Sequence, residues 1–162
     1  AGKLAGFYRA ENAYVTGDGE RTIAELIKNK NAKRHDRISE IQISNETRDF
    51  LARSGYNLDS ILPQGAKVNL SHRIGRFFGG ETEEMLSDLH PSFIPTLERA
   101  AAVTGLAVLG FDCIVPDPRK PAIGQHWGII ECNTLPFIDL HYFALRGKPQ
   151  NIAGLIWDFW AD

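Results

Sequence analysis

The sequence predicts an α+β fold in which an antiparallel sheet is packed by helices. Short runs of β-forming residues alternate with turn signals, and separate segments carry apolar residues at helical spacing. Two apolar segments, 106–115 and 129–132, flank a loop rich in proline and charge, which is typical of a long-looped antiparallel hairpin. With 162 residues, 43% of them hydrophobic, the chain is long enough for one core, so we expect one compact domain.

The first part of the chain predicts two strands, a helix and a third strand. Residues 4–16 are rich in β-formers and end at the turn Gly17-Asp18-Gly19. Residues 22–28 place apolar side chains at helical spacing, with lysines in the last turn. We expect residues 29–37 to form an exposed loop, and the alternation in residues 40–44 predicts a half-buried strand.

The middle of the chain predicts two helices around a further strand. Asn45 offers an N-cap for a helix that stops at Gly55. A Pro-x-Gly turn at 63–65 then leads into a strand over 67–72. From Arg73 to Leu89 the apolar residues follow neither a helical nor a strand period. Pro91 and Pro95 open a helix that reaches Gly105.

The end of the chain predicts an amphipathic helix over 152–160. Its apolar positions should pack on the body of the protein; they are Ile152, Leu155, Ile156 and Phe159. The tryptophans, Trp127, Trp157 and Trp160, are expected to be core or interface aromatics.

Composition excludes several partners. The chain has 18 basic and 20 acidic side chains, so its net charge of -2 favours neither nucleic acid nor an anionic membrane as a partner. No apolar stretch reaches the roughly 18 to 20 residues that span a bilayer, and no leader opens the chain. Cys113 and Cys132 lie in apolar runs without motif spacing, which predicts buried reduced thiols and a cytoplasmic protein. The start at Ala1 and a strand-like opening indicate a chain cut from a larger protein.

Three oxygen-bearing side chains form the strongest chemical pattern. Glu131 and Asn133 share one face of a strand because side chains alternate along it. In a symmetric hairpin Asp112 lies opposite Glu131, so two carboxylates and one amide converge. Oxygen ligands without His or Cys suit Mg²⁺ or Mn²⁺, and a buried carboxylate needs a cation or a partner. The alternative is that each carboxylate bonds the backbone or pairs with a nearby arginine.

A second cluster combines arginines with paired glycines. Arg73 and Arg76 precede Gly79-Gly80, and glycines let backbone amides approach an anion while a guanidinium holds phosphate or carboxylate. The alternative is a polar loop with a flexible tip. His90 is a weaker ligand candidate, because a histidine at a helix start more often completes a cap. His141, eight residues after Asn133, is an equally weak candidate for the same cleft.

Taken together, these segments resemble the ATP-grasp carboxylate–amine ligases, in the branch containing cyanophycin synthetase and the bifunctional glutathione-synthesising enzymes. The resemblance covers nearly the whole chain. Its motifs are Gly17-Asp18-Gly19, Thr22-Ile23, Glu25-Leu26-Ile27, Leu62-Pro63-Gln64-Gly65, Gly79-Gly80, His90-Pro91, Gly110-Phe111-Asp112 and Ile129-Ile130-Glu131-Cys132-Asn133-Thr134-Leu135-Pro136.

The resemblance implies that residues 1–162 form the C-terminal lobe of an ATP-grasp enzyme. Asp112, Glu131 and Asn133 would hold the Mg²⁺ (or Mn²⁺) ions that bridge the phosphates of ATP, and Asn133 would also touch the cofactor. The paired glycines at 79–80 would bind the nucleotide as well. Either Arg73 or Arg76 would clamp the transferred phosphoryl group or the substrate carboxylate. The substrate would be an amino acid or a peptide, and a homo-oligomer is possible in this family.

Two departures from the family pattern leave alternatives open. The related enzymes carry Asn and then Ser or Thr before Gly-Gly, whereas this chain has Gly75-Arg76-Phe77-Phe78. The chain also begins after the region where the family places its phosphate-binding lysines, so we expect it to be inactive alone. A degenerate module used for binding or assembly is one alternative, and a metal-dependent phosphate-ester hydrolase is another.

Overall fold

The computed structural model describes residues 2–161, which divide into two compact units where composition led us to expect one domain. The middle unit is Ala10–Thr82, and the flanking unit comprises the chain up to Arg9 and from Glu83 onward. Each unit has its own cluster of buried apolar side chains. Apolar content alone does not reveal how such side chains divide into clusters.

The α+β class is confirmed, and the strands form three two-stranded sheets in place of a single sheet. Strands β2 and β3 pair antiparallel, as do β5 and β6, while β1 pairs with β4. The strands are β1 (Tyr8–Ala10), β2 (Asn12–Thr16), β3 (Lys67–Ile74), β4 (Thr82–Glu84), β5 (Gly110–Ile114) and β6 (Gly128–Asn133).

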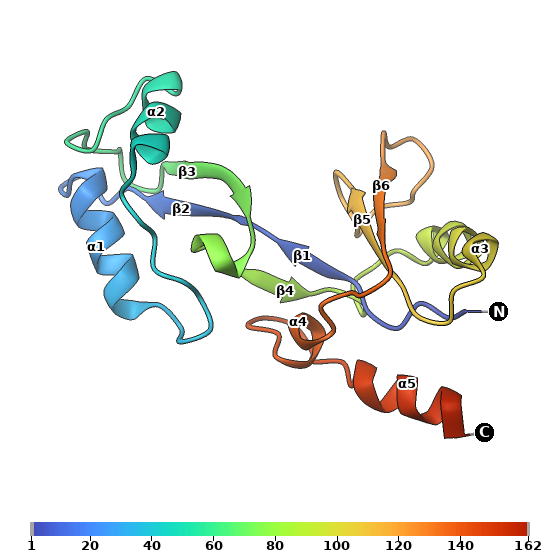
Figure 1. The fold of residues 1–162 in the computed structure, drawn as a ribbon. Helices are drawn as coiled ribbons and strands as arrows, with labels where there is room; N and C mark the ends of the chain where they lie inside the picture. The colour runs from blue at the N-terminus through green and yellow to red at the C-terminus, as the bar shows by residue number, and fades with distance from the viewer. Residues whose placement is uncertain (1, 162) are drawn as a thin grey trace. The chain divides into compact units, whose positions relative to one another are not determined.

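Five α-helices and two short 3₁₀ helices complete the described chain (Figure 1). They are α1 (Ile23–Lys33), α2 (Asn45–Arg53), α3 (Ile94–Thr104), α4 (Asp139–Tyr142), α5 (Ile152–Ala161), η1 (Arg76–Phe78) and η2 (Pro91–Phe93). None of the helices in residues 2–161 has the length and apolar character that a membrane crossing requires.

Helix α1 is longer than the predicted segment and takes up the first half of the expected loop 29–37. Its start is a capping box, in which Thr22 accepts from the Glu25 N–H and Glu25 accepts from the Thr22 N–H. Lys30 extends the helix because its ammonium donates to the Tyr14 carbonyl at 2.9 Å and lies over the Tyr14 ring. Burial lowers the pKa of Lys30, and the Glu81 carboxylate opposes that shift.

The strand predicted at 40–44 is wrong, because these residues belong to none of the strands in residues 2–161. The Asn31 side chain binds Ile41 at two points instead, accepting from its N–H at 2.9 Å and donating to its carbonyl at 3.0 Å. Ile41 is buried, whereas Ile43, the next apolar residue of the alternation, is 42% exposed. Ser44, one residue before the predicted Asn45, is the N-cap of α2.

The middle unit packs α1 and α2 against the β2–β3 pair (Figure 1). Leu51 of α2 and Ile23 of α1 are fully buried. The shared core is Ala13, Val15, Ile23, Leu26, Ile27, Ile41, Leu51, Leu62, Val68 and Leu70.

The flanking unit is centred on Phe93, which is fully buried. Its ring packs edge-to-face with the Trp127 ring, and the two ring centroids lie 4.9 Å apart. Leu97 of α3 and Leu89 complete the buried cluster, and one face of the β5–β6 hairpin covers it. Trp127 is thus a core aromatic, as expected.

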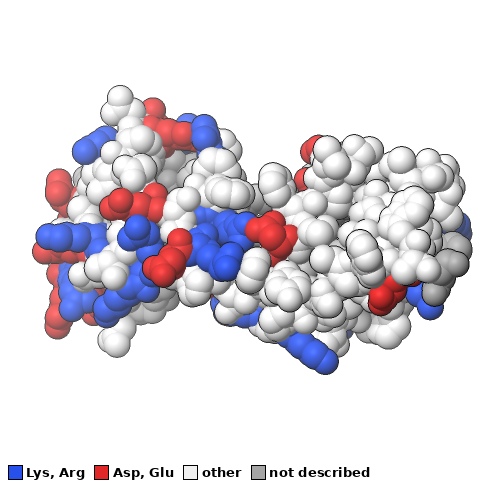
Figure 2. All heavy atoms as spheres, turned by 60° about the horizontal axis from the view of Figure 1, so that its bottom comes forward, with Lys and Arg blue, Asp and Glu red and all other residues white. Residues whose placement is uncertain are grey.

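The packing predicted for α5 is wrong for most of its apolar face, because only Ile152 is buried. Leu155 is 51% exposed and Phe159 62% exposed, and Trp157 and Trp160 are also exposed. Figure 2 agrees, since the face over α5 and its neighbours is largely uncharged, whereas Lys, Arg, Asp and Glu are interspersed over the part that carries α1 and α2.

Candidate functional site

The β5–β6 hairpin brings the two predicted metal-binding carboxylates together. Asp112 pairs with Glu131 in the antiparallel register, and Gly110 pairs with Asn133. The predicted pairing of Asp112 with Glu131 is therefore confirmed. The register shifts between Asp112 and Cys113, which leaves Ile130 as an extra residue on β6.

The carboxylates lie on the open face of the hairpin, and the expectation that they are buried is wrong. Asp112 and Glu131 are exposed, and Asn133 is half-buried. Phe111 and Ile129 take the covered face, where they pack on the Phe93 cluster. The apolar run suggested burial on both faces, but Ile114 and Ile130 are 61% and 65% exposed.

The donor set fits a hard divalent cation. Within residues 2–161, no hydrogen bond or ion pair engages the side chains of Asp112, Glu131 or Asn133, so their oxygens are available. No group of three or more His, Cys, Asp and Glu side chains gathers in the described chain. Two carboxylates and an amide suit Mg²⁺, which keeps several waters and is completed by substrate phosphates.

The cysteines beside this site differ in exposure, so the prediction of two buried thiols is wrong for Cys132. Cys113 is half-buried, whereas Cys132 is exposed. Burial raises the pKa of the Cys113 thiol, and the Asp112 carboxylate raises it further.

The paired glycines shape the loop after β3, and their amides serve the loop itself. The Gly79 N–H donates to the Arg76 carbonyl at 3.3 Å, and the Gly80 N–H donates to the Gly75 carbonyl at 3.1 Å. Gly79 has φ +81°, and a Cβ on Gly80 would collide with the Glu11 carbonyl. In this conformation the two amides do not offer the anion contact that motivated their assignment, and nucleotide binding by Gly79 and Gly80 stays a prediction.

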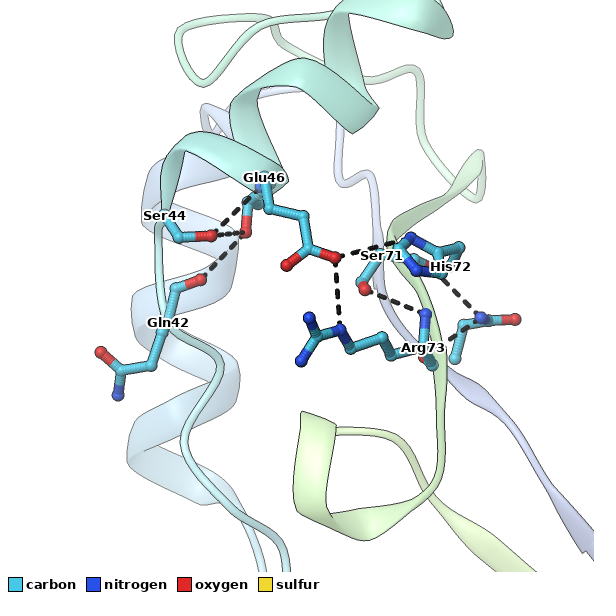
Figure 3. A network of polar contacts seen from close by, with 8 residues as sticks. Gln42, Ser44, Glu46, Ser71, His72 and Arg73 are labelled. Atoms are coloured by element: carbon cyan, nitrogen blue, oxygen red, sulfur yellow. Dashed lines mark hydrogen bonds and ion pairs between the residues drawn. The ribbon is translucent and has the colours of Figure 1, made fainter.

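Arg73 is held by contacts from two directions. Its Nε lies 3.3 Å from Glu46 Oε1 on α2, and its guanidinium lies over the Phe78 ring at 5.2 Å from the centroid. His72 Nδ1 approaches the same carboxylate oxygen at 3.5 Å. Figure 3 shows Glu46 reaching from α2 to both side chains of β3.

The neighbouring Arg76 stacks over Phe77 at 5.3 Å, and its carbonyl accepts from the Ser39 N–H at 2.9 Å. Arg73, Arg76, Gly79 and Gly80 all belong to the middle unit, whereas Asp112, Glu131 and Asn133 belong to the flanking unit.

The weaker candidates have local roles. His90 Nδ1 accepts from the Ser92 N–H at 3.3 Å, so His90 caps η2, which is the structural role considered for it above. Asp18, in the first glycine turn, accepts from the Arg21 and Glu20 N–H groups, which lower its pKa.

A buried Glu–His contact in the flanking unit was missed by sequence reasoning. Glu84 is 3% exposed, and its carboxylate meets His141 Nδ1 at 2.5 Å. The other oxygen of Glu84 accepts from the Phe7 and Leu86 N–H groups, each at 3.0 Å. No spacing links residues 84 and 141, so the sequence held no signal for this pair.

The chain resembles long synthetases over almost its whole length. No family model matches it. A cyanophycin synthetase of Synechocystis sp. is 35% identical over 163 residues, which cover 97% of this chain and 19% of that protein. A glutathione biosynthesis bifunctional protein of Mannheimia succiniciproducens is 31% identical over 156 residues, covering 89% of this chain and 21% of that protein.

A solved structure agrees with these relatives. A bifunctional glutathione synthetase from Pasteurella multocida superposes with a TM-score of 0.78 and 27% identity, over 97% of this chain and 23% of that chain. The chain therefore spans about a fifth of the length of the relatives it matches. The resemblance seen in the sequence is confirmed.

Proposed function

We propose that the full-length protein forms an amide bond between a carboxylate and an amine and consumes ATP in this reaction. The proposal rests on the homology of this chain to the ATP-grasp ligases, which include cyanophycin synthetases and bifunctional glutathione synthetases. The amine and the carboxylate belong to amino acids or peptides. This chain is its C-terminal ATP-grasp region and supplies part of the nucleotide and metal site.

The reaction balances in two steps. A substrate carboxylate oxygen attacks the γ-phosphorus of ATP, the bond from that phosphorus to the β–γ bridging oxygen breaks, and ADP leaves. The amine nitrogen then attacks the acyl carbon, the acyl–oxygen bond breaks, inorganic phosphate leaves, and the amine loses a proton. Both steps depend on positioning and on neutralising charge on the phosphates.

The facing pair of Asp112 and Glu131 carries this proposal. Two exposed carboxylates directly opposite each other on a hairpin repel weakly, and a cation bound between them would relieve that repulsion. Bound Mg²⁺ would neutralise charge on the phosphates. Asn133 lies two residues beyond Glu131 on the same strand and adds a neutral oxygen.

Isothermal titration of the full-length protein with ATP and Mg²⁺ tests the metal assignment. We expect the Asp112→Ala/Glu131→Ala double variant to bind the nucleotide with Mg²⁺ about tenfold or more weakly, a loss of about 1.4 kcal/mol or more. Asp158→Ala, which removes an exposed carboxylate from α5, is the matched control. Equal affinities of the double variant and the wild type would rule out the assignment.

A second assay tests the reaction. ADP release is measured while amino acids and short peptides are screened as substrates, and we expect release to require both a carboxylate and an amine. No release with any substrate would indicate a binding module, and release without an amine would indicate a hydrolase.

A further inference from the structure

We propose that Arg73, in preference to Arg76, is the side chain of the middle unit that binds an oxyanion, and that Glu46 and Phe78 position its guanidinium for this task. The oxyanion is a carboxylate or a phosphoryl group. The inference deepens the proposed ligase function and rests on it for the source of that anion.

The ion pair with Glu46 fixes one edge of the guanidinium. Glu46 Oε1 contacts Arg73 at Nε, 3.3 Å away, and Nε is the nitrogen nearest the backbone. The contact leaves the two terminal nitrogens of Arg73 without a dashed line in Figure 3. Within residues 2–161, no hydrogen bond or ion pair uses these terminal nitrogens.

The Phe78 ring supports the flat side of the same group. Its centroid lies 5.2 Å from the central guanidinium carbon of Arg73, within the range of a cation–π contact. A planar group that is contacted at one nitrogen and on one face has fewer orientations open to its remaining edge. That edge is the fork of parallel N–H groups that binds a carboxylate or phosphate in a bidentate way.

The backbone of the loop strengthens the case for a side chain as the anion ligand. The Gly79 and Gly80 amides donate to carbonyls of their own loop, so they are not offered to an anion. Phe78 directly precedes Gly79, so the same loop supplies the ring that lies against Arg73. Arg76 stacks on Phe77 and has a further interaction of its own.

The contact between Glu46 and Arg73 contributes little to the free energy of folding. A substitution of Glu46 can therefore test the positioning of Arg73 without unfolding the protein. The side chains of Arg73 and Glu46 are 50% and 40% exposed, and exposed ion pairs contribute only about 0–1 kcal/mol. His72 Nδ1 lies 3.5 Å from the same oxygen. Losing the Glu46 carboxylate should therefore loosen the guanidinium while the middle unit stays folded.

The test measures binding of ATP, ADP, inorganic phosphate and acetate to the full-length protein. We expect Arg73→Gln to weaken the oxyanion contact about tenfold, and Arg73→Lys not to restore it, because an ammonium lacks the fork. Glu46→Gln should weaken it about threefold in the wild type and have no further effect in Arg73→Gln. Arg53→Gln and Asp49→Asn, which alter exposed charges on α2, are the matched controls.

The outcomes separate the two anion sources. A larger loss for ATP and phosphate than for ADP assigns Arg73 to the γ-phosphoryl group, and an unchanged ATP affinity with a raised KM for the carboxylate or weaker acetate binding assigns it to the substrate carboxylate. Unchanged binding of every probe and an unchanged KM in Arg73→Gln would overturn the inference. A larger loss in Arg76→Gln, or an equal effect of Glu46→Gln with and without Arg73, would also overturn it.

Failure of the ligase proposal gives a different result. Wild-type protein that releases no ADP with any substrate, yet loses phosphate or acetate affinity in Arg73→Gln, would refute the reaction and leave the oxyanion site standing. Thermal unfolding of each variant is measured alongside, and we expect the midpoints of Glu46→Gln and the wild type to agree within a few degrees.

Discussion

Gly79 and Gly80 owe their identity to backbone geometry in this structure. Gly79 has φ +81°, where a side chain is strained, and Gly80 lies against the Glu11 carbonyl. The sequence showed that two glycines follow the arginines. It does not distinguish glycines that a turn requires from glycines that bind a ligand. The positions of their partners, Glu11 and Ile41, decide between these roles.

Substitution of these glycines should therefore destabilise the middle unit. We expect Gly80→Ala to lower the free energy of unfolding by about 1–3 kcal/mol, because the new Cβ forces the backbone away from Glu11. Gly128→Ala on β6 is the control, since its Cβ would meet open space. Chemical denaturation measures both, and equal stabilities of the two variants would contradict the structural role of Gly80.

His141 gives a second prediction at the scale of single residues. Glu84 is buried, and His141 is its side-chain partner, while two backbone N–H groups remain on its other oxygen. We expect His141→Ala to cost about 1–3 kcal/mol of stability, because it leaves part of a buried carboxylate unsatisfied. His126→Ala removes an exposed histidine from the same unit and should change stability by less than about 0.5 kcal/mol.

Among the elements, α1 shows how far local sequence signals reach. Thr22 and Glu25 stand three residues apart and form the capping box that such spacing allows. The end of α1 was missed because Lys30 and Asn31 look like polar loop residues. Their side chains bind Tyr14 and Ile41, which are distant in sequence, and no local pattern reports such contacts.

The capping box makes the stability of α1 depend on pH. Hydrogen bonds from the Thr22 backbone and hydroxyl lower the pKa of Glu25, so its carboxylate stabilises the fold above the ordinary pKa of glutamate. That contribution is lost as pH falls through the lowered value. We expect Glu25→Gln to be less stable than the wild type at pH 7, and the difference to shrink as pH falls through the lowered pKa of Glu25, as measured by denaturation at several pH values. Glu20→Gln, outside the box, should show no such convergence.

In the β5–β6 hairpin the strand pairing could be predicted from the sequence, whereas the exposure of its side chains could not. Equal distances of residues 112 and 131 from the loop centre gave the correct pairing, because register follows from the loop. The exposure of the Asp112 and Glu131 carboxylates could not be predicted in this way. An apolar segment such as the one around Asp112 can be covered on one face or on both. Ile114 and Ile130 lie on the open side with the carboxylates.

For the whole molecule, two separate cores imply two responses to core mutation. Leu51 is fully buried in the middle unit, and Phe93 is fully buried in the flanking unit. We expect Leu51→Ala to cost about 2–5 kcal/mol and to speed hydrogen exchange mainly in Ala10–Thr82, and Phe93→Ala to act mainly from Glu83 onward. Equal acceleration across both units in each variant would contradict this division.

One amide side chain in the middle unit has a consequence for behaviour in concentrated solution. Asn31 meets Ile41 as a neighbouring strand would, with one donor and one acceptor. Residues 40–44 belong to none of the strands in the described chain, and the Asn31 amide engages both backbone groups of Ile41. We expect Asn31→Ala to leave the Ile41 N–H and carbonyl open to strands of other molecules, and therefore to associate more readily at high concentration than the wild type.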